Sequence, residues 1–283
     1  MAKRTVVAFY DEQATHHAAA LTYYALMSLF PMLLLALSLL GLVGEYPRTY
    51  DAIIAYLRDV VPATTLAPLD DGLRAALRSK GTATTAFVVA VLVALYGGTG
   101  YLEAVRRALN AIFDVHRGRP FLKRKLTDVV SLFLLLALVL VTVTLMFAGG
   151  GTVKDLLGPT AATAWSLGRW PAALAIALFI FSFLYWVTPD VSQRGFRWVT
   201  PGAVLGVGLW LLASAGFSEY LSRFSSLNVT YGSFAAAIIL LVWLWLTNVA
   251  LLFGAVLNAE IERSQQLHEG VPESRTLDLP QRA

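Results

Sequence analysis

The sequence predicts an all-α integral membrane bundle of six transmembrane helices, with short extracytoplasmic and cytoplasmic amphipathic helices. Six stretches of 20 to 36 residues contain no Asp, Glu, Lys, Arg or His: 18–44, 82–102, 129–153, 170–189, 198–218 and 224–259. A helix needs about 20 apolar residues to cross a hydrocarbon core of roughly 30 Å. A helix also bonds every backbone N–H and C=O group within its own segment, as the hydrocarbon requires. Composition agrees, since 57% of residues are hydrophobic and 14% are charged, against about 25% charged in soluble domains.

The chain divides into two predicted parts. Residues 1–263 form one six-helix membrane domain, and residues 264–283 are a polar cytoplasmic tail, with two prolines, that we expect to be disordered. Cysteine is absent, which excludes disulfides and thiolate metal sites. The sequence therefore gives no sign of a separate soluble domain.

The segments before the second stretch have three expected features. Residues 1–17 predict a short interfacial helix that leads into the membrane. The first stretch carries polar side chains and a proline in its interior, at Tyr23, Tyr24, Ser28 and Pro31. The proline removes one helical hydrogen bond and favours a kink. Residues 45–80 show apolar residues at helical spacing, interrupted by prolines, and predict two amphipathic helices that cap the outer surface.

The second stretch ends in an unusual glycine cluster, Gly97, Gly98 and Gly100. Each glycine weakens a helix by about 1 kcal/mol relative to alanine, so the cluster predicts a broken helix near the cytoplasmic interface. An amphipathic helix over 101–115 should follow it.

The later stretches carry clear boundaries. The third ends at the glycines 149–151, the fourth at Pro189, and the sixth helix should cover 234–258. The fifth begins at Pro201, where proline suits the first helical turn. Gly202 and Gly206 then stand four residues apart, which indicates close helix packing.

Lys and Arg residues predict the orientation. With the N-terminus inside, cytoplasmic segments carry 14 of the 22 Lys and Arg residues and extracytoplasmic segments carry eight. Five of those eight lie in 45–81 beside five acids, and the densest basic cluster spans 117–125. Both termini are therefore predicted to be cytoplasmic.

Five local sequences, in order, resemble the YihY/BrkB family of bacterial inner-membrane proteins. They are AAALTYYALMSLFP (18–31), ALNAIF (108–113), PGA (201–203), YGS (231–233) and LNAEI (257–261). The resemblance covers roughly residues 5–263 and implies a six-helix protein of the bacterial inner membrane. Relatives were formerly labelled ribonuclease BN, others were linked to virulence and serum resistance, and movement of lipids or other envelope components has been proposed for some.

Polar residues near the cytoplasmic helix ends form the main candidate site. They are Glu103, Arg106, Arg107, Asn110, Asp190, Asn258 and Glu260. Gathered in one cluster, they would make a gate or a head-group site for an anionic ligand. The alternative, and the more common use of such charges, is a salt-bridge network that fixes helix ends.

A second set of polar positions lies within or beside the stretches. Besides those in the first stretch, they are Glu219, Tyr231 and Asn248. Glu219 could pair with Arg223 at i,i+4. For the tyrosines and Asn248, packing or interhelical hydrogen bonding is the commoner role.

Enzymatic functions find little support in the residues. The four histidines are His16, His17, His116 and His268, and they match neither an H-x-H-x-D-H nor an H-E-x-x-H pattern. No phosphate-binding G-x-x-x-x-G-K-[ST] loop occurs. We therefore expect a non-enzymatic transporter, or a transfer protein for lipids or envelope components. It should need no cofactor, and its partners should be membrane lipids, including anionic head groups, and not nucleic acid. A structural or assembly partner in the envelope is the main alternative, and a membrane-bound ribonuclease is the weakest.

Overall fold

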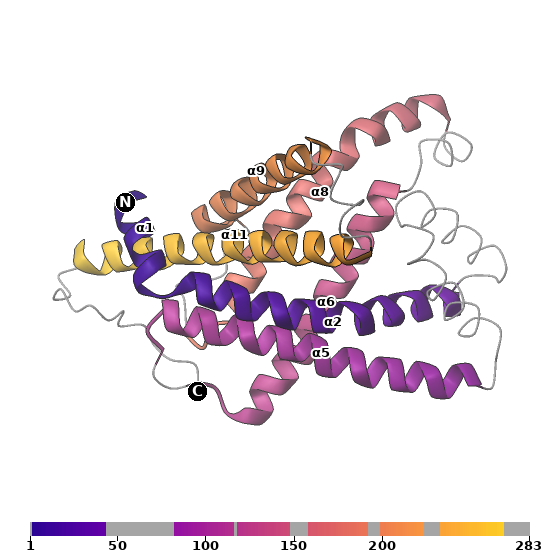
Figure 1. Cartoon of the computed structure of the whole chain (residues 1–283), viewed down its shortest axis with the longest axis horizontal. Helices are drawn as coiled ribbons and strands as arrows, with labels where there is room; N and C mark the ends of the chain where they lie inside the picture. The colour runs from indigo at the N-terminus through magenta and orange to yellow at the C-terminus, as the bar shows by residue number, and fades with distance from the viewer. Residues whose placement is uncertain are drawn as a thin grey trace. The chain divides into compact units, whose positions relative to one another are not determined.

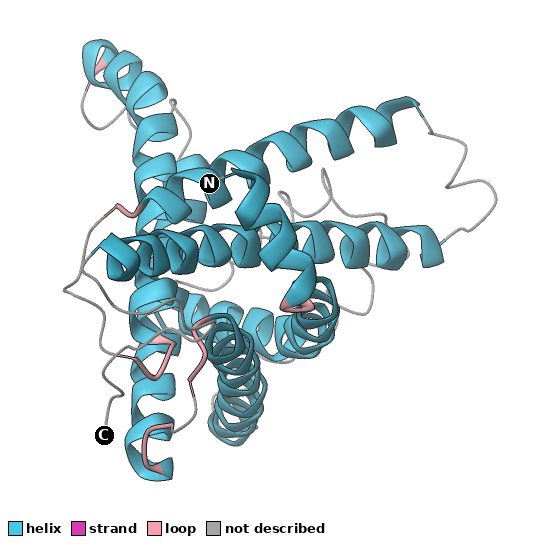
Figure 2. Cartoon of the chain, turned by 90° about the vertical axis from the view of Figure 1, so that its left-hand side faces the viewer, coloured by secondary structure: helices cyan, strands magenta, loops and turns pink. Residues whose placement is uncertain are grey.

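The computed structural model describes residues 2–43, 82–115, 118–147, 158–191, 199–223 and 233–268. Within them every regular element is a helix and no strand is present (Figures 1 and 2). The helices are α1 (Ala2–Asp11), α2 (Ala14–Val43), α5 (Thr82–Ile112), α6 (Phe121–Phe147), α8 (Pro159–Val187), α9 (Pro201–Arg223) and α11 (Ser233–His268). The all-α prediction is confirmed for these residues, whereas the two amphipathic helices predicted over 45–80 lie outside them.

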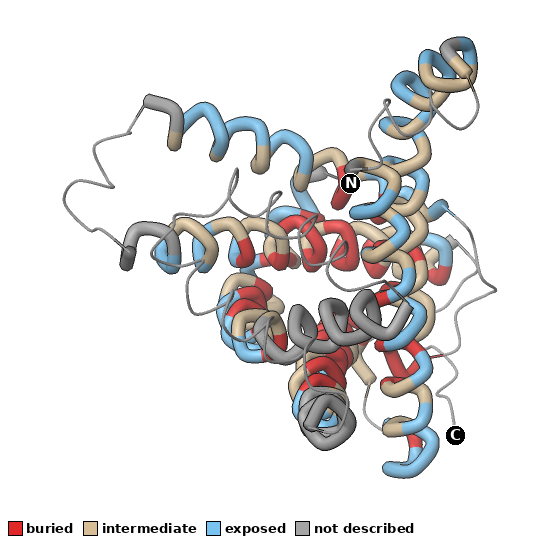
Figure 3. The backbone as a smooth tube through the Cα atoms, turned by 90° about the vertical axis from the view of Figure 1, so that its right-hand side faces the viewer, coloured by how far each residue is buried: buried red, intermediate tan, exposed pale blue. Residues whose placement is uncertain are grey.

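Among the described residues, four helices are long and apolar enough to cross a membrane. The spans are Phe121–Met146, Thr160–Val187, Pro201–Leu221 and Ala237–Leu267, in α6, α8, α9 and α11. Buried and exposed positions alternate along the helices, as the red and pale-blue segments of Figure 3 show. Many exposed positions are large and apolar, such as Val139, Val141 and Leu212. Such surfaces suit contact with acyl chains. Helices α2 and α5 cover the first two predicted stretches, and their crossing stays a prediction.

The chain forms two compact units. The first contains residues 1–21, 102–216 and 245–283, and the second contains residues 22–101 and 217–244. Helices α2, α5, α9 and α11 contribute residues to both. All the ionic contacts described below lie within the first unit.

The N-terminal helix packs on α11, within the first unit. Thr5 and Phe9, one helical turn apart on α1, are both buried. The Phe9 ring lies 5.2 Å from the Phe253 ring of α11, and Arg4 Nε lies 3.5 Å from Glu260 Oε2. A helix is present in the N-terminal segment, over Ala2–Asp11 and so shorter than predicted, and its place at the membrane interface stays a prediction. Gln13, with φ 51°, separates α1 from α2.

The predicted break in the second stretch is wrong, because α5 runs without interruption from Thr82 to Ile112. In the second unit, a Cβ built on Gly97 would lie 3.1 Å from Ser28 Cα of α2. The Thr99 hydroxyl donates to the Leu95 carbonyl at 2.6 Å and adds a side-chain bond within the same turns. The glycine therefore serves the close approach of α2 to α5. Packing offsets the weak helix propensity, as it commonly does in membrane helices.

Three helices extend beyond their charge-free stretches, because the charges in the added turns have partners. Helix α6 begins at Phe121 and contains Asp128, which pairs with Arg106. Helix α8 begins at Pro159 and contains Arg169, which donates to the Met146 carbonyl of α6 at 3.3 Å. Helix α11 ends at His268, so the first part of the predicted disordered tail, 264–268, is helical. Gln266, in that part, is buried. The rest of the tail lies outside the described residues.

Helices α9 and α11 approach each other most closely at two glycines. A Cβ on Gly202 would lie 2.1 Å from the Gly254 carbonyl oxygen, and one on Gly254 would lie 2.3 Å from the Gly202 oxygen. Gly206, one turn along α9, faces Phe181, Tyr185 and Ala250. The close packing expected from the Gly202–Gly206 spacing is therefore confirmed.

Tyr185 of α8 packs against Gly206 and Gly254 at this contact, and its hydroxyl gives a first prediction. Its fully buried side chain donates a 2.6 Å hydrogen bond to the Leu251 carbonyl of α11. Tyr185→Phe should lower the unfolding free energy by about 1 kcal/mol, the usual net value of one such bond. Thermal unfolding in detergent micelles measures the loss. Tyr220→Phe, at a side chain about half exposed, is the matched control, and an equal change in both variants would contradict the prediction.

Candidate functional site

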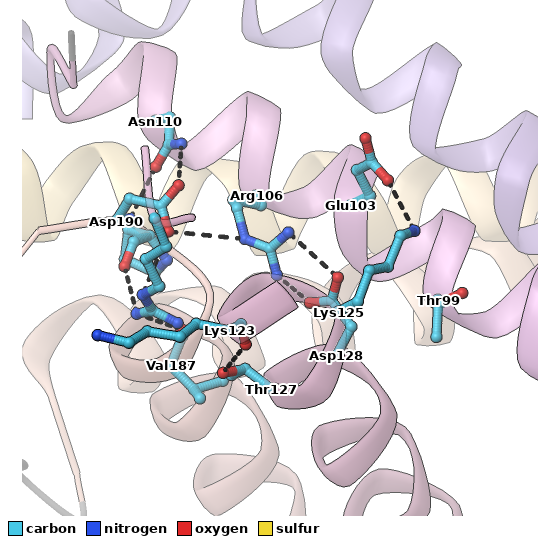
Figure 4. A network of polar contacts seen from close by, with 12 residues as sticks. Thr99, Glu103, Arg106, Asn110, Lys123, Lys125, Thr127, Asp128, Val187 and Asp190 are labelled. Atoms are coloured by element: carbon cyan, nitrogen blue, oxygen red, sulfur yellow. Dashed lines mark hydrogen bonds and ion pairs between the residues drawn. The ribbon is translucent and has the colours of Figure 1, made fainter. Parts of the chain in front are cut away.

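The centre of the candidate site is a buried ion pair between Arg106 of α5 and Asp128 of α6 (Figure 4). Arg106 Nη2 bonds Asp128 Oδ1, and Nη1 donates to Oδ2 at 3.2 Å. The two side chains are 3% and 2% exposed. Two parallel bonds to one carboxylate are the strongest geometry that a guanidinium offers. Asp128 lies inside the span Phe121–Met146, so this pair joins α5 to a helix long enough to cross the membrane.

Asp190, just after the end of α8, lies on the other side of Arg106, as Figure 4 shows. Its side chain is 1% exposed, and its Oδ1 lies 3.8 Å from Arg106 Nε and 3.2 Å from Arg119 Nε. Asn110, one turn after Arg106 on α5, donates to Asp190 Oδ2 at 3.0 Å. The Asp190 backbone N–H donates in return to Asn110 Oδ1 at 2.9 Å. Asp190 is therefore held from both its side chain and its backbone.

Arg119, in the segment between α5 and α6, completes what we call the Arg–Asp quartet: Arg106, Arg119, Asp128 and Asp190. Its Nη2 donates to the carbonyls of Val187 and Pro189 at 3.0 and 3.1 Å. These carbonyls stand at the C-terminal end of α8, where a helix leaves acceptors unpaired and favours a positive charge. Burial lowers the pKa of Arg119, and Asp190 opposes that shift. Because the quartet holds two positive and two negative groups, its formal charge is zero.

Glu103 lies one turn before Arg106 on α5 and forms a more exposed contact. It accepts from Arg107 Nη2 at 2.7 Å. It also accepts from Lys125 Nζ of α6 at 3.1 Å, as Figure 4 shows. The hydrogen bond from Arg107, followed by that from Lys125, lowers the Glu103 pKa to about 2, although burial opposes the shift. Here one acid serves two bases, so this contact carries a net positive charge.

The lowered Glu103 pKa gives a second prediction. A depressed carboxyl pKa adds stability above the unfolded value, near 4.5, and this stability is lost as pH falls toward about 2. The unfolding temperature of the wild type should therefore drop more between pH 5 and pH 2.5 than that of Glu103→Gln. Scanning calorimetry in an acid-stable detergent measures both. Glu219→Gln, at an exposed position on α9, is the control. Parallel curves for the wild type and Glu103→Gln would refute this assignment.

Asn258 and Glu260, which the sequence places in the same candidate cluster, make other contacts in the structure. Asn258 Oδ1 accepts from the Gly202 N–H at 2.8 Å, and its Nδ2 donates to Thr200 Oγ1 at 3.1 Å. Glu260, 5% exposed, bonds Arg263 and lies near Arg4. Residues two apart on a helix point about 200° away from each other. One face of α11 could not bring both to the same site.

The remaining predicted positions are dispersed. Tyr23 and Tyr24 are exposed, with ring centroids 5.6 Å apart, and the Ser28 hydroxyl donates to the Ala25 carbonyl of its own helix. Asn248 is buried on α11, and Glu219 is exposed on α9. Pro31 falls within α2, and Tyr231 lies outside the described residues. A functional role for these positions stays a prediction.

Sequence reasoning missed Asp128, Arg119 and Lys125. Glu103 and Lys125 are separated by the same number of residues as Arg106 and Asp128. Helices joined by so short a connection usually run antiparallel, where paired residues keep a constant sum of residue numbers, so this spacing does not predict the observed pairs. Elsewhere in the described part of the chain, no three His, Asp or Glu side chains lie where they could share a metal ion.

Comparison with known proteins gives a consistent answer. Residues 5–277 match the family described as virulence factor BrkB. A protein of Bacillus subtilis (strain 168), YfkH, whose name describes it as ribonuclease-like, is 27% identical over 90% of this chain and 92% of its own length. UPF0761 membrane proteins of Nitrosospira multiformis and Stenotrophomonas maltophilia (strain K279a) are 29% and 28% identical over 90% and 89% of this chain.

The chain spans only 59% and 58% of those two longer relatives. No solved structure matches the chain. The family match covers almost the whole sequence, and relatives named as membrane proteins agree with the four long apolar helices. The chain is thus a multi-pass membrane protein and belongs to the BrkB family that its sequence resembles, the YihY/BrkB family.

Proposed function

We propose that this chain is a non-enzymatic protein of the bacterial inner membrane that transports or transfers a lipid or another envelope component. In this proposal α2 and α5 also cross the bilayer, which gives six spans and cytoplasmic termini. Both helices are 30 residues or longer, and a crossing requires about 20. The basic residues of 117–125 support the orientation.

The Arg–Asp quartet is the observation that carries the proposal. Ionisable groups within membrane segments are rare, they commonly pair with one another, and they often mark functional sites. Asp128 belongs to a span, and the side chains of all four members are at most 7% exposed. The quartet links three elements of the first unit: α5, α6 and the end of α8.

The contacts around Asp190 support a gate rather than a permanent lock. Asp190 Oδ1 lies near two guanidinium groups, yet it accepts no hydrogen bond from either of them. Arg106 Nε, likewise, makes no hydrogen bond. Asp190 Oδ1 could therefore shift between the two arginines without breaking a hydrogen bond, while Oδ2 stays bonded to Asn110. A change of partner would alter how the end of α8 is held against α5.

A lipid-transfer assay tests the proposal. The purified chain is reconstituted in vesicles that contain fluorescent phosphatidylglycerol, and dithionite quenching reports movement of the probe between leaflets. We expect quenching beyond that of protein-free vesicles. Arg106→Lys, which keeps the charge but loses the parallel bonds to Asp128, should slow it at least tenfold.

Arg107→Lys is the matched control, because Arg107 adjoins Arg106 but its side chain is 75% exposed. Helicity and elution as a single species establish that each variant is folded. If Arg106→Lys does not fold, Asp128→Glu replaces it in the assay. Protein-free rates for the wild type would count against transfer of this lipid class. Equal lipid-transfer rates for Arg106→Lys and Arg107→Lys would show that the quartet has no role in transfer.

An envelope scaffold is the second candidate, and the neutrality of the quartet favours it. Balanced charges, fully enclosed, can simply fix the ends of three elements. If the protein is a scaffold, folded variants of the quartet should support its cellular function as well as the wild type does. If the quartet is a gate, the same variants should lose that function.

A ribonuclease is tested separately, since one relative's name includes that activity. His16 is exposed at the start of α2 and His17 is partly buried beside it. Cleavage of RNA by the purified chain, lost on replacing both histidines by alanine, would replace the transport proposal with an enzymatic one.

A further inference from the structure

Helix α1 is a short helix with a small buried face. Thr5 and Phe9 are buried, and Phe9 meets the Phe253 ring of α11, beside which α1 lies in Figure 1. Most other described side chains of α1 are exposed. A helix of ten residues is marginal in water by itself, so α1 depends on this contact for its structure. Gln13 follows it in the left-handed region, at φ 51°, and separates it from α2.

Charged side chains of α1, α11 and the end of α5 lie together beside this contact. Glu260 of α11 bonds Arg263, and its Oε2 lies 3.5 Å from Arg4 Nε of α1. Arg263 Nη2 lies 3.4 Å from Asp114 Oδ2. Asp114 stands just after α5 with φ 53°, a conformation that Asp adopts more readily than most residues. The ends of α5 and α11 are thus joined through Arg263, and α1 contacts the same group of charges through Arg4.

Glu12, directly after α1, brings a further carboxylate to these charges. Burial, followed by the negative charge of Asp114, raises the pKa of Glu12 above its ordinary value of 4.5. Arg263 opposes this shift, whereas Asp11 and Glu260 add to it. Such surroundings disfavour the charged form of a carboxyl group. The charged Glu12 therefore works against the docking of α1, and the protonated Glu12 does not.

We propose that α1 is a clasp over the ends of α5 and α11, and that uptake of a proton by Glu12 tightens it. Release of α1 would take Glu12 away from Asp114 and Glu260 and return its pKa toward the ordinary value. Docking is therefore stabilised as pH falls through the docked pKa toward 4.5. Each unit of difference between the docked and released pKa changes the docking equilibrium tenfold. The clasp requires no movement of lipid, so it goes beyond the transfer function and does not depend on it.

The other charged groups near Glu12 do not give the same response. Arg4 and Arg263 keep their charge, as arginines in proteins do. His16 and His17 follow in the first turn of α2. Burial, together with His16, lowers the pKa of His17, so protonation of His17 destabilises the folded state as pH falls. Acid would loosen the structure through His17 and tighten it through Glu12, so the direction of the response separates the two groups.

Distance measurements between spin labels test the clasp. Because the chain has no cysteine, Val7→Cys on α1 and Gln265→Cys on α11, both at exposed positions, can each carry one nitroxide. Double electron–electron resonance on the full chain in micelles then measures the docked population as a narrow distance and the released population as a broad one. The ratio of released to docked α1 should fall severalfold between pH 7.5 and pH 5.

Glu12→Gln, which carries no charge at either pH, should keep α1 docked at both and remove the response. Asp11→Asn is the matched control, because it removes the neighbouring acid at an exposed position and should leave the response in place. Phe9→Ala should raise the released population at both pH values. The proposal is overturned if the wild-type distances do not change with pH, or if Glu12→Gln responds as the wild type does. Release of α1 on acidification, instead of tightening, would also overturn it and would assign the response to the histidines.

Discussion

Replacing Gly202 by alanine should lower the unfolding free energy by about 3 kcal/mol or more, at the upper end of the effects seen for overpacked interiors. The new methyl carbon would lie 2.1 Å from the Gly254 carbonyl oxygen and within 2.6 Å of the Asn258 side chain. Neither the Gly254 carbonyl nor the Asn258 side chain can move away without a loss of stability. The first is backbone of α11, and the second holds the Gly202 N–H and Thr200 at the start of α9. The helices would have to separate, and the Tyr185 bond to Leu251 would be strained with them.

Gly208→Ala is the matched control on the same helix, because nothing lies within 4 Å of a Cβ built there. Alanine is the better helix former by about 1 kcal/mol, so this variant should be neutral or slightly more stable. The unfolding midpoints of the two variants are compared by heating them in detergent micelles while the helix content is monitored. Similar midpoints for Gly202→Ala and Gly208→Ala would show that α9 and α11 do not pack through these glycines.

The lengths of apolar sequence predicted the helices but misplaced their ends. Charge-free stretches locate what can lie in hydrocarbon, and the helices continue wherever the next charges find partners. Asp128 and Arg169 are paired or bonded to a carbonyl, so α6 and α8 begin earlier than the stretches indicate. Such partners come from other helices, so a single helix considered by itself does not reveal them.

Glycine was ambiguous for the same reason. The same residue type weakens an isolated helix and permits close helix contact. At Gly202 the spacing pointed to contact, and at Gly97 the cluster suggested a break, yet both glycines pack against a neighbouring helix. Propensity alone could not decide between them, because the packing partner, Ser28 or Gly254, lies far away in the sequence.

The candidate site was predicted by composition and corrected by geometry. Glu103, Arg106, Asn110 and Asp190 do lie at one region of the first unit. Asn258 instead contacts Gly202 at the start of α9, and Glu260 bonds Arg263, whose Nη2 lies 3.4 Å from Asp114 Oδ2 just after α5. Arg119 and Asp128 were missed because a single charge beside a basic run resembles a solvated loop residue until its partner is known.

Replacing Arg106 by methionine should lower the unfolding free energy by about 3–5 kcal/mol, the usual effect of removing one partner from a buried ion pair. Asp128 would lose both its bonds, and Asp190 would keep only Arg119 and Asn110. Arg107→Met removes the same charge from the next residue, where the side chain is 75% exposed. An exposed pair is worth about 1 kcal/mol or less, so this control should change little. Equal losses in the two variants would mean that Arg106 is not enclosed as described.

The double variant Arg106→Met, Asp128→Leu separates stability from function. It removes both charges of the pair, so it should recover most of the stability that Arg106→Met alone loses, because well-packed apolar residues often replace a buried pair without penalty. A coupling of about 0.5–3 kcal/mol between the two substitutions is expected for residues in contact. If this folded double variant fails to move lipid, the charges act in transfer. If it moves lipid at the wild-type rate, the quartet only fixes the helices, because an apolar pair can do that equally well.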